Sequence, residues 1–174
     1  MYVYLDVDET LTNSIKAVLT VLNKRYNTNY KAYQVTTWNF TNLFPDMTNE
    51  EIEEIFNSDD FFENLKFKPY AKKWLKQQHE LNNVTLVTHG SQINLQKKKK
   101  WFEQQGFKNI NFIGLPHEIN KGNIDMSDAL FIDDCKSNLE CSNAKYKILY
   151  KNIPDGEWLK DWDGMYIKSF GELI

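Results

Sequence analysis

Three short polar clusters in the sequence carry residue types that suit metal-assisted phosphate chemistry. They are Asp6-Val7-Asp8-Glu9-Thr10, Thr88-His89-Gly90-Ser91 and the pair Asp133-Asp134, and each follows directly on an apolar run. Carboxylate oxygens are hard ligands that suit Mg²⁺, which binds a few carboxylates together with substrate phosphate. If the clusters meet in space, they form a candidate site for a magnesium ion and a phosphate group.

The charge of such a site restricts how it can work. Asp6, Asp8, Asp133 and Asp134 together carry a charge of −4 when all are ionised, and this charge repels a phosphate dianion. A divalent metal ion and one lysine would offset most of it. We therefore expect a bound metal, at least one lysine and a raised pKa on one of the carboxyl groups.

The apolar runs before the clusters have the pattern of buried strands. They are short and rich in β-branched or aromatic residues: Tyr2–Leu5, Val84–Val87 and Ala129–Ile132. Helical patterns alternate with them, which predicts an α/β fold with a parallel sheet and right-handed crossovers. Ligands of such sheets bind beyond the carboxyl ends of the strands, where all three clusters fall.

Local signals indicate where the neighbouring elements begin and end. Asn13 or Ser14 is placed to cap a helix that ends near residues 25–27. Pro69 is expected to begin a second helix, and Gly106 is expected to end a third. Further elements are expected at about residues 110–113, 147–150 and 165–174.

Residues 28–66 differ in composition from the rest of the chain. Aromatic residues are interleaved with Asn, Thr and Asp, and the alternation of a strand is absent. Thr48 followed by Glu51 is a capping-box signature that begins a helix. We predict a small helical cap at 28–66, inserted in an α/β core domain formed by residues 1–27 and 67–174.

Composition narrows the class of protein. The 174 residues, 41% hydrophobic and 26% charged, suit one globular domain with a small insertion. Twenty-one basic against twenty-four acidic residues lack the footprint of a nucleic-acid binder, so no polymeric nucleic acid is expected as partner. There is no signal-peptide pattern and no run of roughly 20 apolar residues to cross a membrane. Cys135 and Cys141 are interpreted as free thiols, so we expect a cytoplasmic protein. We expect it to be a monomer or a homodimer.

The polar clusters resemble the motifs of the haloacid-dehalogenase (HAD) phosphohydrolases. Asp6-Val7-Asp8-Glu9-Thr10-Leu11 matches their DxDx[TV]L first motif. Val84–Thr88 is similar to the second motif, an apolar strand followed by Thr or Ser, and Leu130–Asp134 to the fourth, hhhDD. The motifs follow in order and span almost the whole chain. The resemblance implies a Rossmann-like parallel sheet flanked by helices, with a small helical cap inserted after the first strand.

Within that superfamily the chain resembles most the 5′(3′)-deoxyribonucleotidases. Asp60–Leu65 and the following Pro69-Tyr70-Ala71 are similar to their FFxxLxPxxGA segment, with Tyr70 where Gly is usual. Lys100–Gly106 is similar in character to their KxxWVxxxxG helix, with shifted spacing. The resemblance implies Mg²⁺-dependent removal of phosphate from deoxyribonucleoside or ribonucleoside monophosphates.

Two further departures from the pattern of the deoxyribonucleotidases concern the predicted site. Glu9 stands where their first motif has Gly, and His117-Glu118-Ile119-Asn120-Lys121 stands where they have RDK. By position, Lys121 corresponds to their phosphate-binding lysine.

The resemblance also implies a mechanism with two displacements. Asp6 would attack phosphorus and form an aspartyl-phosphate, while Asp8 would protonate the leaving alkoxide and then deprotonate the attacking water. Thr88 and Lys121 would bind the phosphoryl oxygens as charge shifts in the transition state.

The same resemblance assigns the metal ligands. Mg²⁺ would be held by Asp6, the backbone carbonyl of Asp8 and Asp134, with Asp133 orienting Lys121 or a metal-bound water. Which carboxylate of the Asp133-Asp134 pair binds the ion directly stays open at this point.

Aromatic residues of the predicted cap are candidates for contact with the nucleobase. Phe56 matches a base-contacting aromatic position of the deoxyribonucleotidases, and Trp38 or Phe40 lies where another is expected. His89 is expected to shape the phosphate loop. The run Lys97–Lys100 is interpreted as a solvated helix face.

Two other functions compete with the nucleotidase hypothesis. One is a HAD phosphatase for another small phosphate ester, such as a sugar phosphate or a nucleic-acid 3′-phosphate end. The other is a non-catalytic HAD-fold protein that binds a nucleotide, which the intact pair of Asp6 and Asp8 disfavours.

Overall fold

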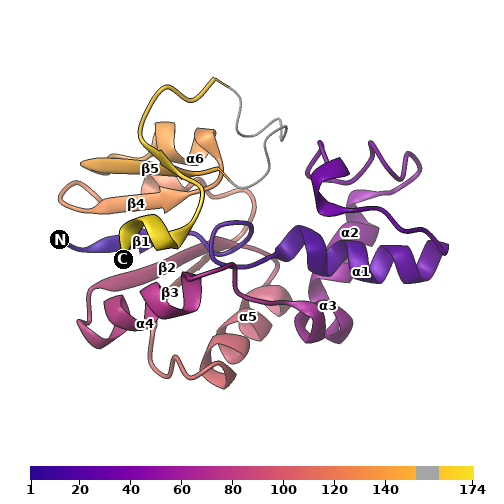
Figure 1. Ribbon diagram of the computed structural model, residues 1–174, viewed down its shortest axis with the longest axis horizontal. Helices are drawn as coiled ribbons and strands as arrows, with labels where there is room; N and C mark the ends of the chain where they lie inside the picture. Colours follow the sequence, from indigo (N-terminus) through magenta and orange to yellow (C-terminus); the bar gives the residue numbers. More distant parts are fainter. Residues whose placement is uncertain (152–160) are drawn as a thin grey trace.

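The structure, a computed structural model, describes residues 1–151 and 161–174 (Figure 1). Its centre is a six-stranded sheet in the order β3-β2-β1-β4-β5-β6, and every neighbouring pair of strands is parallel. The strands are β1 (Val3–Leu5), β2 (Val84–His89), β3 (Asn111–Leu115), β4 (Leu130–Asp133), β5 (Tyr146–Tyr150) and β6 (Tyr166–Ile167). The predicted α/β fold with a parallel sheet is confirmed. Residues 152–160, part of the predicted core domain, lie outside the described residues.

Alternate residues of the central strands pack on opposite faces of the sheet, because successive side chains of a strand point in opposite directions. Leu5 and Ile132 belong to one apolar cluster, which α4 (Ala71–Glu80) and α5 (Gln92–Gln104) cover. Phe131 belongs to a second cluster, to which α6 (Lys136–Cys141) contributes. Burial on both faces explains why these strands are continuously apolar.

After β1 the chain leaves the sheet and forms a group of helices beside it. Figure 1 shows α1 (Ser14–Tyr26) extending away from the sheet, with α2 (Asn49–Asn57) and α3 (Asp59–Asn64) packed along it. A short 3₁₀ turn, η1 (Ala32–Gln34), precedes α2. Residues 28–66, which we call the insertion, are therefore helical where they are regular. The Thr48–Glu51 capping box that begins α2 is confirmed.

The two chain segments that join the sheet to the insertion run side by side. Thr12 and Phe67 form an antiparallel bridge. The amide of Asn13 donates to Lys66 O, and the amide of Lys68 donates to Leu11 O, both at 2.9 Å. The outgoing and returning segments thus make a short two-stranded junction between the sheet and the insertion.

The structure corrects two of the predicted helix boundaries and confirms a third. Asn13 makes no side-chain bond that caps α1; instead the amide of Ile15 donates to Glu9 Oε1 at 2.8 Å. Pro69 does not begin α4, because Tyr70 has a left-handed backbone with φ of 64° and the helix starts after it. Gly106, with φ of 101°, does follow the end of α5, as predicted.

The carboxyl-terminal region ends in η4 (Phe170–Leu173), which packs against α4 through Phe170 and Trp74. Among the described residues, no helix combines the length and the apolar character that crossing a membrane requires.

Candidate active site

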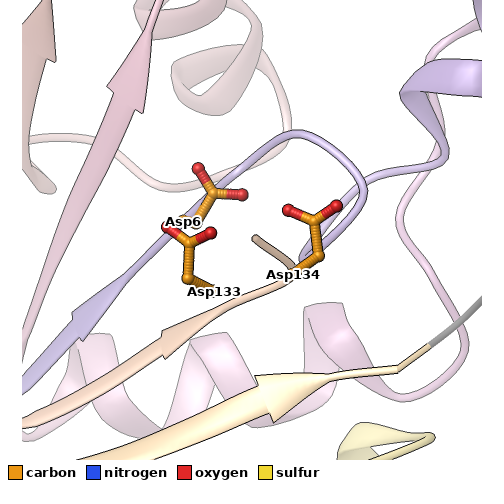
Figure 2. Close-up of side chains that lie close together, drawn as sticks. All are labelled: Asp6, Asp133 and Asp134. Carbon is orange, nitrogen blue, oxygen red and sulfur yellow. The ribbon is translucent and has the colours of Figure 1, made fainter. Parts of the chain in front are cut away.

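Neighbouring parallel strands bring the three polar clusters of the sequence to one edge of the sheet. Leu5 of β1 is in register with Leu86 of β2 and with Ile132 of β4, so the residues that follow these strands lie together. Figure 2 shows the carboxyl groups of Asp6, Asp133 and Asp134 gathered at the ends of β1 and β4. One oxygen from each of the three lies within 4.8 Å of the others, and all three residues are buried.

Lys121 joins two of these carboxylates. It lies in η2 (Lys121–Asn123) and is 1% exposed, and its Nζ lies 2.5 Å from Asp6 Oδ1 and 2.7 Å from Asp133 Oδ2. The amide of Cys135 and the side chain of Asn138 also donate to Asp133, at 2.8 and 3.1 Å. Asp133 is thus fully engaged by protein donors.

Asp8 lies beside Asp6 in the loop after β1 and is held by polar side chains of other elements. Ser14 Oγ donates to its Oδ1 at 2.7 Å, and Thr88 Oγ1 donates to its Oδ2 at 3.3 Å. Lys98 Nζ forms an ion pair with the same Oδ2. The structure therefore brings Asp8 and Thr88 into direct contact, as the position of both clusters at one sheet edge predicts.

Lys98 is the residue of this site that the sequence interpretation missed. It is 1% exposed and lines the cavity above the site that is described below. Its Nζ also donates to Thr88 Oγ1 and to the backbone oxygen of His89, both at 2.9 Å. Our interpretation of the whole run Lys97–Lys100 as a solvated face is wrong at this position. Helical spacing could have shown it, because Lys98 shares the inward face of α5 with Trp101 and Phe102.

Burial raises the pKa of two of the clustered carboxyl groups, those of Asp6 and Asp134. It is the main cause that raises the pKa of Asp6 to about 7; Lys121 opposes the shift, and Asp133 and Asp8 add to it. Burial and the neighbouring carboxylates also raise the pKa of Asp134. Burial alone lowers the pKa of Lys121, but the attraction of Asp133 and Asp6 outweighs it and the pKa is raised, so Lys121 stays a cation. The raised carboxyl pKa that the charge arithmetic predicts is present.

The acidic cluster fits a hard divalent cation. Its donors are carboxylate oxygens that meet within a few ångströms, and one buried lysine offsets only part of their charge. Among the hydrogen bonds of the described residues, Asp134 is contacted only by Thr10 Oγ1, at 3.5 Å, so it is the carboxylate of the cluster with most room for an ion. Asp6 accepts from Lys121 Nζ and, at 2.9 Å, from Thr10 Oγ1, and Asp133 accepts from Lys121, Cys135 and Asn138.

A cavity of about 550 Å³ opens over the site. Its lining includes the polar residues Asp6, Asp8, Lys98, Lys121 and Asp134, and the aromatic residues Trp38 and Phe56 of the insertion. The rings of Trp38 and Phe56 stack with centroids 6.0 Å apart. Charged groups that suit a phosphate and rings that suit a planar heterocycle therefore share one cavity.

Two histidines line the same cavity. His89 Nε2 lies 2.8 Å from the backbone oxygen of Ile119, two residues before Lys121, and the ring of His89 stacks on that of His117 at 6.2 Å. Burial lowers the pKa of His89. His89 lies against the loop that carries Lys121, and its predicted role in shaping the phosphate loop stays a prediction. The cavity position of His117 had not been predicted.

Phe40 is not a cavity residue. Its side chain is completely buried in the main apolar cluster, and its backbone has φ of 63°. A ring enclosed in this way has no surface to offer a ligand, so the prediction that Phe40 contacts substrate is wrong. Of the two alternatives for that contact, the structure brings Trp38 to the cavity.

Glu9 shows how the chain accommodates its departure from the glycine of the deoxyribonucleotidase motif. Its backbone keeps a left-handed conformation, with φ of 57°, of the kind that glycine adopts most readily. The buried carboxylate accepts from the amide of Ile15 and pairs with Lys68 Nζ at 2.7 Å. Glu9 therefore ties the loop of Asp6 and Asp8 to the first turn of α1 and to the returning segment of the junction.

The sequence is similar to those of known proteins over most of its length. Residues 1–161 match the profile of a family described as 5′ nucleotidase, deoxy (pyrimidine), cytosolic type C protein (NT5C). A protein of Staphylococcus epidermidis named "Putative 5′(3′)-deoxyribonucleotidase" is 26% identical over 145 residues, which cover 81% of this chain and 78% of that protein.

Solved structures are similar in fold. A HAD family hydrolase from Deinococcus radiodurans, with bound phosphate and sodium, has a TM-score of 0.63 at 12% identity, covering 99% of this chain and 92% of that one. A HAD hydrolase from Bacillus subtilis bound to magnesium has a TM-score of 0.55 at 12% identity, covering 99% and 96%.

Proposed function

The chain belongs to the NT5C family of 5′-nucleotidases and is a phosphatase with the HAD fold; from this premise we propose that it hydrolyses deoxyribonucleoside monophosphates. The observation that carries the proposal is the shared cavity, lined by Asp6, Asp8 and Lys121 and by the stacked rings of Trp38 and Phe56. Its volume of about 550 Å³ lies within the usual range for small-molecule sites.

Asp6 is the proposed nucleophile. Its carboxylate would attack phosphorus, forming a bond from Asp6 to phosphorus while the bond from phosphorus to the ester oxygen breaks. Lys121 keeps a positive charge 2.5 Å from Asp6 Oδ1, which stabilises the ionised, nucleophilic form of Asp6 and neutralises phosphoryl charge beside it. Asp133 and Asn138 would act through Lys121, by fixing its position.

Asp8 is the proposed acid and base. It would give a proton to the departing alkoxide and then take one from the water that opens the aspartyl-phosphate. Its oxygens already contact hydroxyl and ammonium donors of Ser14, Thr88 and Lys98, so its orientation is fixed before substrate arrives. Thr88 and Lys98 would also bind phosphoryl oxygens.

The metal ion would be held by Asp6, Asp134 and the backbone carbonyl of Asp8. Asp133 would fix the position of Lys121 through their ion pair. When bound, Mg²⁺ supplies charge neutralisation and orientation of the phosphoryl group. The buried, raised-pKa carboxyls support this assignment, because a cation beside them offsets the cost of their ionisation. We also propose a reducing, cytoplasmic setting, in line with the free thiols Cys135 and Cys141.

A substrate panel tests the proposal. Purified protein is assayed for phosphate release from dAMP, dCMP, dGMP, dTMP, the matching ribonucleotides, 2-glycerol phosphate and a hexose phosphate, with Mg²⁺ and with EDTA. We expect the highest kcat/KM for a deoxyribonucleotide and loss of activity in EDTA. A preference for a phosphate ester without a base would refute the nucleotidase assignment, and equal activity in EDTA would refute the metal requirement.

A further inference from the structure

The amino-terminal half of α5 makes a set of polar contacts with the carboxyl-terminal end of α2, across the boundary between the core and the insertion. Asn94 Nδ2 donates to the backbone oxygen of Phe56 at 2.6 Å, and Lys97 Nζ donates to the backbone oxygen of Asn57 at 2.8 Å. Ser91 Oγ donates to Asn57 Oδ1 at 2.7 Å. We call these three contacts the α5 clamp.

The clamp satisfies groups that α2 cannot satisfy by itself. The last carbonyl groups of an α-helix have no partner within the helix, and Phe56 and Asn57 are the last two residues of α2. A cation near this end of a helix is also favourable for the helix dipole. Lys97 supplies that charge and, in addition, pairs with Asp59 at the start of α3 at 2.7 Å.

The Asn94 side chain is buried and closely packed against Gly90. It is 2% exposed, and a Cβ at Gly90 would lie 2.5 Å from Asn94 Oδ1, too close for both to stay where they are. The absence of a side chain at Gly90 therefore leaves the space that the Asn94 amide occupies. Ser91 takes part at both ends: it caps α5 by accepting from the amide of Asn94 and donates to Asn57.

The helix that the clamp holds carries one wall of the cavity. Five residues of α2 line it. Four have the spacing of one helical face, Asn49, Ile52, Glu53 and Phe56, and the fifth is Asn57, the last residue of the helix. One turn after Asn94 on α5 comes Lys98, which is paired with Asp8. The same helix thus fixes the wall that faces the substrate and the carboxylate proposed as acid and base.

We propose that Asn94 and Lys97 are positioning residues that hold α2, and with it the Phe56 ring, against the reaction centre. They set the affinity for a substrate that reaches the insertion, such as a nucleotide. This part rests on the proposed function. The mechanical part, that the clamp restrains α2, does not. Asn94 itself lines the cavity, whereas Lys97 is not one of the lining residues, so Lys97 is the residue that tests positioning apart from contact with the substrate.

Hydrogen exchange of the backbone amides of residues 49–57 tests the mechanical part. We expect Asn94→Ala, Lys97→Ala and Gly90→Ala each to speed exchange in α2 by roughly fivefold or more, the equivalent of about one lost hydrogen bond. Exchange in β1, β2 and β4 should stay at the parent rate, which excludes global unfolding as the cause. Lys100→Ala, on the exposed side of α5, is the control and should leave α2 unchanged. Parent exchange rates in α2 in all three variants would overturn the proposal.

Steady-state kinetics with two substrates, one with a nucleobase that can extend to the insertion and one without, test the functional part. In Lys97→Ala we expect KM for dTMP to rise several-fold while kcat/KM for 2-glycerol phosphate, which has no base, stays at the parent value. Asp59→Ala removes the exposed ion pair but keeps the contact with Asn57, so its KM for dTMP should change less. An equal shift for both substrates, or none for dTMP, would overturn the positioning role. A parent enzyme that hydrolyses no nucleotide would instead refute the proposed function, while the exchange measurement would still decide the clamp.

Discussion

Lys121 Nζ lies 2.5 Å from Asp6 and 2.7 Å from Asp133, so one buried ammonium group is shared by a carboxylate that follows β1 and one at the end of β4. Asp6 lies more than a hundred residues before both Lys121 and Asp133 in the sequence. Their meeting depends on β1 and β4 being neighbours in the sheet. With the role proposed for Lys121 in binding the phosphoryl group, we expect stability and catalysis to be coupled at this lysine.

Lys121→Met should destabilise the protein by about 3 kcal/mol or more at pH 7.5, because it leaves buried carboxylates without a partner. The double variant Lys121→Met/Asp133→Asn should recover part of that loss, since one of the charges is gone. Both variants lack Lys121, so neither should hydrolyse the phosphate ester. Urea unfolding followed by circular dichroism measures the stabilities. A Lys121→Met protein as stable as the parent would contradict the coupling.

The stability of the metal-free protein should fall as pH rises. The pKa of Asp6 is raised from 3.8 to about 7, so the folded protein binds more protons than the unfolded chain between these values, and the slope of unfolding free energy against pH is negative there. The raised pKa of Asp134 acts in the same direction. Melting temperatures in EDTA should therefore decrease from pH 5 to pH 7.5.

Mg²⁺ should reverse this trend, because it binds the ionised carboxylates and raises the melting temperature more at pH 7.5 than at pH 5. Asp6→Asn should flatten the pH profile in EDTA and reduce the magnesium effect. A stabilisation by Mg²⁺ that is the same at both pH values would argue against binding at this cluster.

Lys98→Ala should lower kcat by on the order of 10²-fold, the loss usual for one donor to a developing oxyanion. The neighbouring variants Lys99→Ala and Lys100→Ala, at exposed positions of the same helix, should retain parent kinetics. Steady-state assays with the best deoxyribonucleotide compare the three. Equal effects from all three would show that only the overall charge of the run matters.

Phe56→Ala and Phe40→Ala should separate ligand contact from packing. Phe56 lines the cavity, so its loss should raise KM for a deoxyribonucleotide about three- to tenfold, the worth of one aromatic contact. Phe40 is enclosed in the core, so its loss should cost about 3–5 kcal/mol of stability. Thermal unfolding and KM measured on both variants test the pair; a KM effect larger in Phe40→Ala would reverse our assignment.

Much of this arrangement could be predicted from residue patterns, and the failures have physical causes. The strand Leu130–Asp133 is buried on both faces, and its first three residues are all apolar, which made the strand and the acidic pair at its end easy to find. The burial of Lys98 was missed because a run of lysines suggests solvent, whereas its helical face decides its place. Phe40 was misjudged because an aromatic residue in an insertion can face either the cavity or the core, and spacing alone does not distinguish them.

The cap of α1 shows a further limit of local signals. Asn13 has the residue type and position of a helix cap, yet the amide of Ile15 bonds to Glu9 instead. Glu9 is held there by Lys68, whose position depends on the returning segment of the junction. A contact that requires three separate segments to meet leaves no pattern in any one of them.

Single-turnover labelling tests the central claim, that Asp6 carries the phosphoryl group, most directly. Protein in excess over 5′-[³²P]-labelled dTMP and Mg²⁺ is quenched in acid, and the labelled peptide is identified. We predict a transient, base-labile label on Asp6 in the parent, and neither label nor phosphate release in Asp6→Asn. Phosphate release at the parent rate from Asp6→Asn, or label on another residue, would contradict the account.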